Sequence, residues 1–222
     1  MEVRIYPFGP LQANMYMVVV GKEALIIDPC VSFDSIDLEG IDVKGIFCTH
    51  AHYDHIIEAD NLSRKTKSVL MAYSEEIPVM KDSIRNGSAM RFLPYSVKSH
   101  VIPLTDGAEF GPDDFLMSGS EPFLIRVIHT PGHTMGSISL FFEFSEIKKG
   151  GKILFTGDTI FAGSIGRTDL GGDMDEMKQS IAKIAAMDED VIIYPGHGES
   201  TTVGEETLHS PFFTAAFYND II

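Results

Sequence analysis

The stretch CTHAHYDH, residues 48–55, constrains this chain more than any other, because it places three histidines and an aspartate within six positions. Packing alone seldom requires so many imidazoles in one place. His50 and His52 are two residues apart, so in an extended segment their side chains point the same way, and Asp54 extends that row. His55 breaks the alternation and is expected to face a second direction at the start of a helix. Imidazole and carboxylate suit zinc, iron and manganese, so this stretch predicts ligands for two adjacent metal ions.

Three further candidate ligands follow apolar, strand-like runs elsewhere in the chain. The run FLIRVIHTPG leads to His133, KILFTG leads to Asp158, and DVIIYPG leads to His197. Taken singly, each residue could belong to a turn or a helix cap. In a layered α/β protein, however, sites form where strands end and open into loops. GIFCT leads to His50 in the same way, so four strands that each deliver a ligand predict one shared metal site.

The rest of the pattern predicts an α/β protein with more strands than helices. Strand-like runs rich in β-branched and aromatic residues are MYMVVV, EALIID, VKGIFCT, SVLMAY, FLIRVIHT, SISLFFEF, KILFTGDT and DVIIYPG. A helix is expected from Asp173, with Glu176 as its capping partner and apolar residues at helical spacing behind them. Two more helices are expected, one from Asp54 through Leu62 and one over residues 74–84.

Composition excludes several classes of protein. The 222 residues fit one medium domain over 1–222, and 44% of them are hydrophobic. The formal net charge of −15 opposes binding to nucleic acid, and no apolar run is long enough to cross a membrane. No signal peptide is visible in MEVRIYPFGP, so a cytoplasmic location is expected. Cys30 and Cys48 form no disulfide framework and are expected to be buried small residues.

The motifs together resemble the metallo-β-lactamase superfamily, and within it the glyoxalase II-like hydrolases, which cleave hydroxyacylglutathione thioesters. The resemblance covers nearly the whole chain, from FGPLQANMYMV through LIIDP, THAHYDH, HTPGHTMGS and FTGDTIFAGSIGRTDL to YPGHGESTTVGEE. It implies an αββα sandwich with a dinuclear metal site at one edge. Matched by position, the first metal would be held by His50, His52 and His133, and the second by Asp54, His55 and His197. Asp158 would bridge the two.

The resemblance also implies a mechanism. Two divalent ions, zinc first and iron or manganese next, would bridge a water that loses its proton near neutral pH. The resulting hydroxide would attack a small-molecule thioester or related ester, and Asp54 would both bind metal and orient the nucleophile. Asp28 could support a ligand histidine from behind, or it could simply form the turn at Asp-Pro.

The segment GSIGRTDLGGD leaves two other classes of function open. Arg167 could contact substrate, but a structural pair between Arg167 and Asp169 is the preferred interpretation. The same motif resembles mononuclear iron persulfide dioxygenases, which is the alternative to a hydrolase. A non-catalytic or nucleic-acid-processing member is disfavoured by the full ligand set and by the charge. A β-lactamase is disfavoured because Asp158 would usually be replaced.

The C-terminal region departs from glyoxalase II. No lysine or arginine follows His197, so the usual basic clamp for glutathione is missing. The apolar tail, residues 207–222, is expected to pack on the sandwich or on a second subunit, which makes a homo-oligomer possible. Arg85 and Arg91 lie in KDSIRNGSAMRF, a segment that could cover the site, and they are the remaining candidates for binding an anionic substrate.

Overall fold

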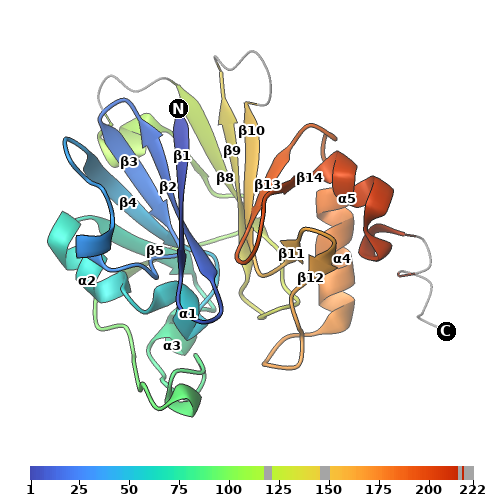
Figure 1. The fold of residues 1–222 in the computed structure, drawn as a ribbon, viewed down its shortest axis with the longest axis horizontal. Helices are drawn as coiled ribbons and strands as arrows, with labels where there is room; N and C mark the ends of the chain where they lie inside the picture. Colours follow the sequence, from blue (N-terminus) through green and yellow to red (C-terminus); the bar gives the residue numbers. More distant parts are fainter. Residues whose placement is uncertain (118–121, 146–150, 215–216, 218–222) are drawn as a thin grey trace.

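Two six-stranded sheets face each other in the computed structural model, with helices on both outer faces (Figure 1). The structure describes residues 1–117, 122–145, 151–214 and 217. Because the other residues, including most of the last eight, lie outside it, a single domain over 1–222 stays a prediction. The first sheet has the order β1 (Glu2–Phe8), β2 (Ala13–Val20), β3 (Glu23–Ile27), β4 (Asp42–Cys48), β5 (Val69–Tyr73) and β6 (Val101–Leu104).

The second sheet is built from the C-terminal half of the chain. Its order is β14 (Thr201–Thr202), β13 (Ile192–Pro195), β10 (Lys152–Gly157), β9 (Ile138–Phe144), β8 (Phe123–His129) and β7 (Glu109–Phe110). A small two-stranded ribbon, β11 (Ile160–Phe161) with β12 (Ser164–Ile165), follows β10. All eight expected strands are present. The first strand, β1, and the short strands β6, β7, β11, β12 and β14 were not predicted.

Helices cover the outer face of each sheet, so the predicted αββα sandwich is confirmed. Beside the first sheet lie α1 (Tyr53–Ile56), α2 (Ala59–Thr66) and α3 (Ile77–Met80), and beside the second lie α4 (Met174–Ala185) and α5 (Val203–His209) (Figure 1). Short 3-10 turns span Phe33–Ser35, Ala89–Arg91, Pro112–Phe115 and Pro211–Phe213. No helix among the described residues is long and apolar enough to cross a membrane.

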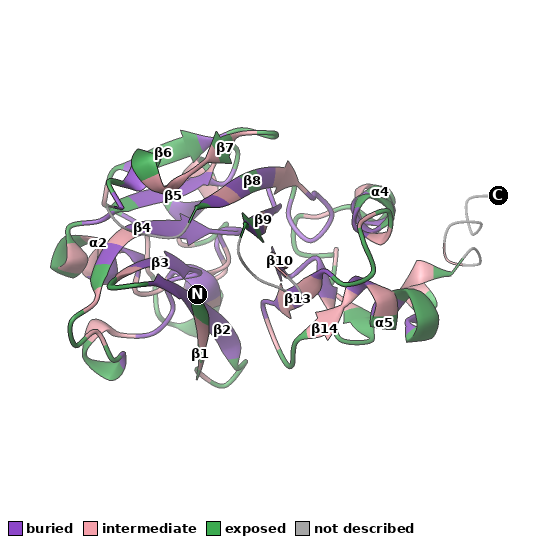
Figure 2. Cartoon of the chain, turned by 90° about the horizontal axis from the view of Figure 1, so that it is seen from above, coloured by how far each residue is buried: buried purple, intermediate pink, exposed green. Residues whose placement is uncertain are grey.

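Three apolar layers hold the sandwich together, and strand periodicity assigns residues to them. On β2, Met15 and Met17 belong to the layer under α1 and α2, whereas Tyr16 and Val18 belong to the layer between the sheets. Both faces of β2 are therefore buried, which explains its unbroken apolar sequence. The third layer lies between β10, β13 and α4. Figure 2 shows the result, with buried strands in the middle and exposed residues on the outer helices and loops.

Two helix predictions are wrong in extent. The single helix expected from Asp54 to Leu62 is broken into α1 and α2, because the Glu58 N–H donates to the Pro29 carbonyl at 3.0 Å instead of continuing the helix. The helix expected over residues 74–84 is only α3, four residues long. It ends there because the Asp82 carboxylate accepts hydrogen bonds from the backbone N–H groups that follow it.

Sheet topology brings the candidate ligands to one edge. β8 and β10 are both antiparallel to β9, and β13 is parallel to β10, so the C-terminal ends of these three strands point the same way. Backbone bonds join the two sheets at that edge, since Ile138 N–H donates to the Thr49 carbonyl at 2.9 Å and Asn14 N–H donates to the Gly196 carbonyl at 2.7 Å. The site therefore forms along the seam between the sheets.

Candidate metal centre

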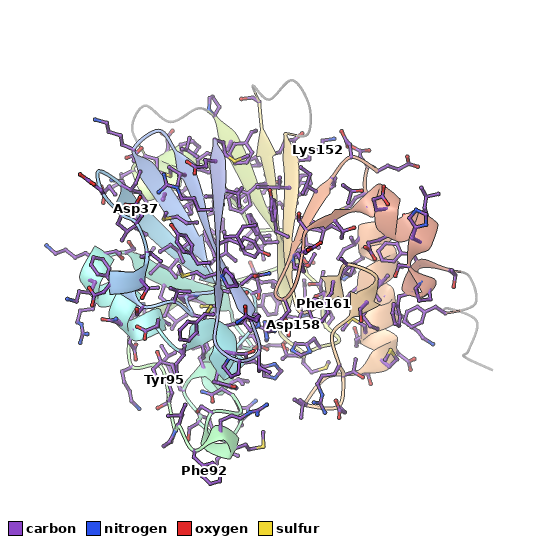
Figure 3. All side chains as sticks on the ribbon, in the orientation of Figure 1. Asp37, Phe92, Tyr95, Lys152, Asp158 and Phe161 are labelled. Carbon is purple, nitrogen blue, oxygen red and sulfur yellow. The ribbon has the colours of Figure 1, made fainter. Side chains whose placement is uncertain are left out.

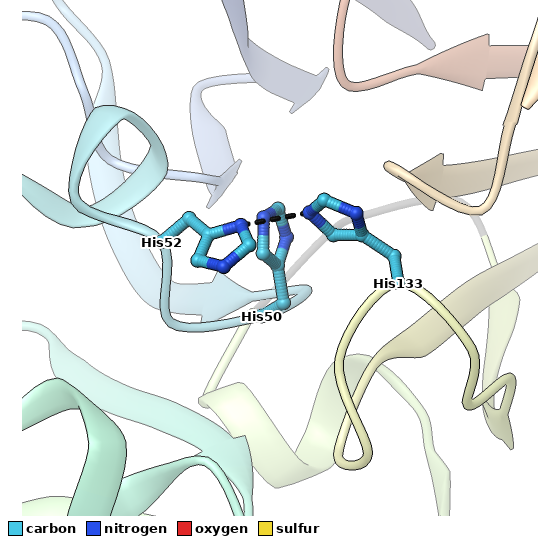
Figure 4. A group of neighbouring side chains, drawn as sticks. All are labelled: His50, His52 and His133. Atoms are coloured by element: carbon cyan, nitrogen blue, oxygen red, sulfur yellow. Dashed lines mark hydrogen bonds between the residues drawn. The ribbon is translucent and has the colours of Figure 1, made fainter. Parts of the chain in front are cut away.

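His50, His52 and His133 form the first of two adjoining groups with metal-ligand spacing. One nitrogen from each ring lies within 4.8 Å of the others. His50 and His52 come from the loop after β4, and His133 comes from the loop after β8, so the group spans both sheets. Figure 4 shows the three rings turned toward one another, with His52 Nδ1 2.7 Å from His133 Nε2. The pair is hydrogen-bonded while one of these nitrogens carries a proton; with both unprotonated, their lone pairs could face one cation together.

Asp54, His55 and His197 form the second group, again within 4.8 Å of one another. Asp54 and His55 lie in the short helix α1, and His197 follows β13. Asp54 was expected to continue the row of His50 and His52 in an extended segment. It lies instead in the first turn of a helix that begins after His52. The expected second direction of His55 is found, but Asp54 shares it, because the helical turn places both residues with His197 in the second group.

Asp158 lies between the two groups. Its Oδ2 is 3.4 Å from His133 Nε2 and 3.5 Å from His197 Nε2, and its Oδ1 is 3.3 Å from His55 Nε2. Two buried atoms at this point, Asp158 Oδ1 and His50 Nε2, have no hydrogen-bond partner within the described parts of the chain. Burying such atoms unpaired is costly, and a cation between the groups would satisfy both. The residues thus fit a pair of divalent cations.

Close packing leaves room for nothing larger than hydrogen at Gly196, which precedes His197. A Cβ atom there would lie 2.1 Å from Asp158 Oδ1 and 2.8 Å from the His55 ring. Asn14 holds the same loop from the other sheet, because its side-chain amide donates to the carbonyls of Pro195 and Gly198. The backbone after β13 is therefore drawn tightly against the site.

Hydrogen bonds at the outer nitrogen fix the orientation of three of the rings. His133 Nδ1 donates to the Arg167 carbonyl at 2.7 Å, and His197 Nδ1 donates to the Leu11 carbonyl at 2.9 Å. His55 Nδ1 donates to the Asp28 carboxylate at 3.0 Å. A proton on Nδ1 leaves the lone pair on Nε2, which in each ring faces the centre.

Asp28 supports both groups at once. Besides binding His55, its carboxylate accepts from Thr49 N at 2.7 Å and Thr49 Oγ1 at 2.8 Å, and Thr49 Oγ1 lies 3.1 Å from His50 Nδ1. Asp28 is 1% exposed and has a positive φ of 55°, a conformation that costs free energy outside glycine. The supporting role is thus the one the structure favours over a plain turn.

The side chains of the site divide in their electrostatic character. Burial, followed by the neighbouring imidazoles, lowers the pKa of His50 well below its usual value and the pKa of His52 to about 4; burial also lowers the pKa of His133. Burial opposes protonation at His55 too, but the charge of Asp158 outweighs it and raises the pKa of His55. Burial alone would raise the pKa of Asp158, yet the charge of His55 holds it well below its usual range.

Glu76 is a buried carboxylate that sequence reasoning missed. Its Oε2 accepts the Ala51 N–H at 2.6 Å and its Oε1 accepts the Gly136 N–H at 3.1 Å. Ala51 lies between two histidines of the first group, and Gly136 lies in the loop that carries the third. Glu76 therefore connects the two loops that build this group. Only the buried position of Glu76, next to exposed Glu75, distinguishes it, and no motif marks that position in the sequence.

A cavity of about 630 Å³ opens over the site. Its walls include the three arginines predicted to contact substrate: Arg85, Arg91 and Arg167. Arg167 is nevertheless paired with Asp169 through two bonds of 2.6 Å, which is the preferred structural interpretation. Figure 3 shows Asp158 and Phe161 close together at this edge of the sandwich, and both line the cavity.

The remaining predictions about individual residues also have outcomes. His129, the last residue of β8, has a structural role, with Nε2 2.8 Å from the Met135 carbonyl and its ring stacked on Tyr73. Cys30 and Cys48 are both buried and free, and burial raises the pKa of the Cys30 thiol to about 12. The described part of the tail packs on the third apolar layer, with the remainder outside the described residues.

A sandwich of two mixed sheets with histidine and aspartate groups at one edge is the architecture of a metallo-β-lactamase fold. The model of the metallo-β-lactamase superfamily matches residues 8–197, so the chain belongs to this superfamily of metal-dependent hydrolases. Among curated relatives, Probable metallo-hydrolase YqgX of Bacillus subtilis is 32% identical, covering 96% of this chain and 97% of that protein. Hydroxyacylglutathione hydrolase GloC of Haemophilus influenzae is 31% identical, covering 97% and 99%.

Two solved structures are also similar over almost their full length. BLEG-1 B3 metallo-β-lactamase has a TM-score of 0.82 and 32% identity, covering 96% of this chain and 100% of that chain. TTHA1623, in a di-iron-bound form, has a TM-score of 0.73 and 28% identity, covering 95% and 100%. The predicted family and fold are confirmed by these matches.

Proposed function

We propose that this chain is a dinuclear metal-dependent hydrolase that cleaves a thioester of the hydroxyacylglutathione type. The observation that carries the proposal is the pair of adjoining ligand groups with Asp158 between them. Its seven residues are His50, His52 and His133 in the first group, Asp54, His55 and His197 in the second, and the shared Asp158. A site for one ion would not require two complete groups.

The roles of the side chains follow from their positions. Two divalent cations, zinc first and iron or manganese as alternatives, would supply Lewis acidity and make a water nucleophilic near neutral pH. Asp54 lies at the cavity wall, where its second oxygen can accept a proton from that water and orient it toward a carbonyl carbon. The carboxylates of Asp54 and Asp158 would offset the charge of the cations.

The choice of substrate is supported by GloC, whose name describes hydrolysis of hydroxyacylglutathione. Arg85 and Arg91 are the cationic groups available to an anionic substrate, because Arg167 is engaged by Asp169. Two exposed arginines form a weaker clamp than a buried basic pocket. S-lactoylglutathione should therefore be cleaved, but with a high Michaelis constant that falls only modestly at low salt.

Elemental analysis and activity measured together test the proposal. We expect close to two ions per chain after careful metallation, and thioester cleavage at the same rate with and without oxygen. A stoichiometry fixed at one, unchanged by His55→Ala and His197→Ala, would exclude the dinuclear site.

A mononuclear iron oxygenase is the second candidate, because the similar structure TTHA1623 holds iron, although its two ions match the dinuclear site. Oxygen uptake with glutathione persulfide, together with no thioesterase activity with any metal, would establish it in place of the hydrolase. A β-lactam belongs in the same substrate panel, because BLEG-1 is described as a B3 metallo-β-lactamase. Homo-oligomerisation and a cytoplasmic location stay predictions, which light scattering and cell fractionation would test.

A further inference from the structure

An exposed apolar segment borders the metal cavity. Within residues 84–93, Ile84 is 73% exposed, Met90 64%, Phe92 93% and Leu93 62%. Single exposed apolar residues are ordinary, but four within ten residues concentrate apolar surface on one segment, and such patches bind other molecules.

The backbone under this patch is held in place by buried polar side chains. Asn86 and Ser88 are fully buried. The Asn86 side chain and the Ser88 hydroxyl both donate to the Tyr95 carbonyl, at 2.9 and 3.0 Å, and the Asn86 carbonyl accepts the Tyr53 N–H at 3.0 Å. The segment is thereby fixed to α1, next to Asp54. Its apolar side chains are presented by an ordered loop and are not exposed through lack of local structure.

The patch continues into the cavity and includes positive charge. Ile84 and Met90 line the cavity, where they meet apolar side chains from other parts of the chain: Leu11, Phe161 and Leu170. Arg85 and Arg91 come from the same segment and make no ion pair with any residue that the structure describes. A chain with a net charge of −15 thus places two unpaired arginines beside an apolar wall at the mouth of its metal site.

We propose that the substrate is a thioester of an apolar acyl group, several carbons long, on an anionic thiol carrier. This inference rests on the proposed thioester hydrolysis and narrows the preferred acyl group, which makes short hydroxyacyl thioesters the poorer substrates. The acyl chain lies along Ile84 and Met90 and reaches toward Phe92, while Arg85 and Arg91 bind the anionic carrier. Lactoyl, with three carbons and a hydroxyl, leaves this wall uncovered.

Apolar burial sets the size of the expected effect. Burying one methylene stabilises a complex enough to raise kcat/KM about fourfold, as long as the chain still has wall to cover. The wall ends at the rim, so the gain should stop once the acyl chain extends beyond it. A dependence of this shape is distinct from the flat response of a site that holds only the thioester group.

An acyl series on three carriers tests both halves of the proposal. Acetyl, butyryl, hexanoyl and octanoyl thioesters of glutathione, of coenzyme A and of uncharged N-acetylcysteamine are assayed with the metal-loaded protein. We expect kcat/KM to rise about fourfold per methylene before levelling off, and to be at least tenfold higher on one of the anionic carriers. Equal rates for all acyl lengths, or equal rates on the uncharged carrier, would overturn the proposal.

Variants locate the effect on the segment. Met90→Ser and Ile84→Ser should reduce the gain per methylene to less than twofold. The matched control is Leu208→Ser, which changes a 76% exposed leucine on α5, outside the cavity. Arg85→Gln with Arg91→Gln should lower the preference for anionic carriers about tenfold, with Arg64→Gln on α2 as control. If the controls act as strongly as the cavity variants, the segment does not select the substrate.

Non-hydrolysable ligands separate this inference from the proposed function. Binding of S-methyl, S-butyl and S-hexyl thioethers of glutathione and of coenzyme A is measured by calorimetry. Affinity that rises with alkyl length, without hydrolysis of any thioester, would leave the recognition intact and disprove the hydrolase. Hydrolysis combined with length-independent binding would disprove the inference alone, and the absence of both binding and hydrolysis would disprove both.

Discussion

Asp158 is the residue through which the two ligand groups interact. Because its oxygens face His133, His197 and His55, its removal takes a donor from both groups at once. We predict that Asp158→Ala lowers the affinity for both ions and reduces hydrolysis by at least a hundredfold. Calorimetric metal titration with the thioester assay would measure both effects.

Asp169→Ala is the control for that experiment. Asp169 lies eleven residues after Asp158, and its carboxylate is exposed to solvent. The Arg167–Asp169 pair is exposed, so its loss should change stability little and leave metal binding near normal. If Asp169→Ala abolished metal binding and Asp158→Ala did not, the ligand assignment would be wrong.

Glu76 makes a second residue-level prediction. An amide in place of its carboxylate puts a donor where one of two backbone N–H groups now donates, so one of the two loops must move. Glu76→Gln should weaken binding of the ion held by His50, His52 and His133 by about tenfold or more. The d–d spectrum of the cobalt-substituted protein should change as well, whereas the neighbouring, exposed Glu75→Gln should leave both unchanged. Identical spectra for the two variants would show that Glu76 does not position the first group.

At the scale of elements, the residue that caps α4 also contacts the loop that carries His133. Asp173 caps the helix by accepting hydrogen bonds from Asp175 N and Glu176 N at 2.9 and 3.0 Å, while its own N–H donates to the Gly132 carbonyl, beside His133. Asp173→Ala should lower the free energy of unfolding by about 1 kcal/mol. Urea denaturation would measure it, with Asp175→Ala as the control. No difference between the two variants would mean that the cap contributes nothing.

The long apolar runs predicted their strands, because a strand buried on both faces needs a continuous run of apolar residues and few other structures do. Helices were less predictable, since local contacts decided where they ended. The Glu58 N–H bonds to Pro29, which lies 29 residues earlier and on another segment, and no periodicity in residues 54–62 reports that. Likewise, Glu176 does not complete a capping box with Asp173, because the Asp173 N–H donates to the Gly132 carbonyl instead.

The site divides in the same way. Its ligands were readable because each follows a strand and because His50 to His55 concentrates rare residue types. The residues that hold these ligands were not, since Glu76 and Asn14 act on loops that are distant in sequence. Their partners are backbone N–H and carbonyl groups, which every residue has, so the sequence does not mark them. Asp28 was only half readable, because a turn and a supporting carboxylate leave the same Asp-Pro pattern.

For the whole molecule, the site is the place where the two sheets meet. Four of its residues, His50, His52, Asp54 and His55, follow β4 of the first sheet, and the other three follow strands of the second. Cations bound there would join the halves and stabilise the folded state by about 4 kcal/mol at a free concentration a thousandfold above Kd. Chelation should therefore lower Tm by several degrees, as calorimetry would show. An unchanged Tm after complete metal removal would mean that the ions do not connect the sheets.

Acidification should separate the two ions. The imidazoles of the first group all have lowered pKa values, that of His52 about 4, so protons compete less with a cation there. In the second group the pKa of His55 is raised, and Asp158 raises the pKa of His197 against the effect of burial, so a cation must displace protons there.

Affinity at the second group should consequently fall as pH falls from 8 to 5.5, while affinity at the first changes little. Equilibrium dialysis at fixed free metal should show two ions per chain at pH 8 and one near pH 5.5. The retained ion should be lost in His52→Ala and kept in His55→Ala. Calorimetry in buffers of different ionisation enthalpy should find more proton release for the second ion than for the first, because the pKa values of its imidazoles are raised. Loss of both ions in a single step would mean that Asp158 couples them more strongly than their histidines separate them.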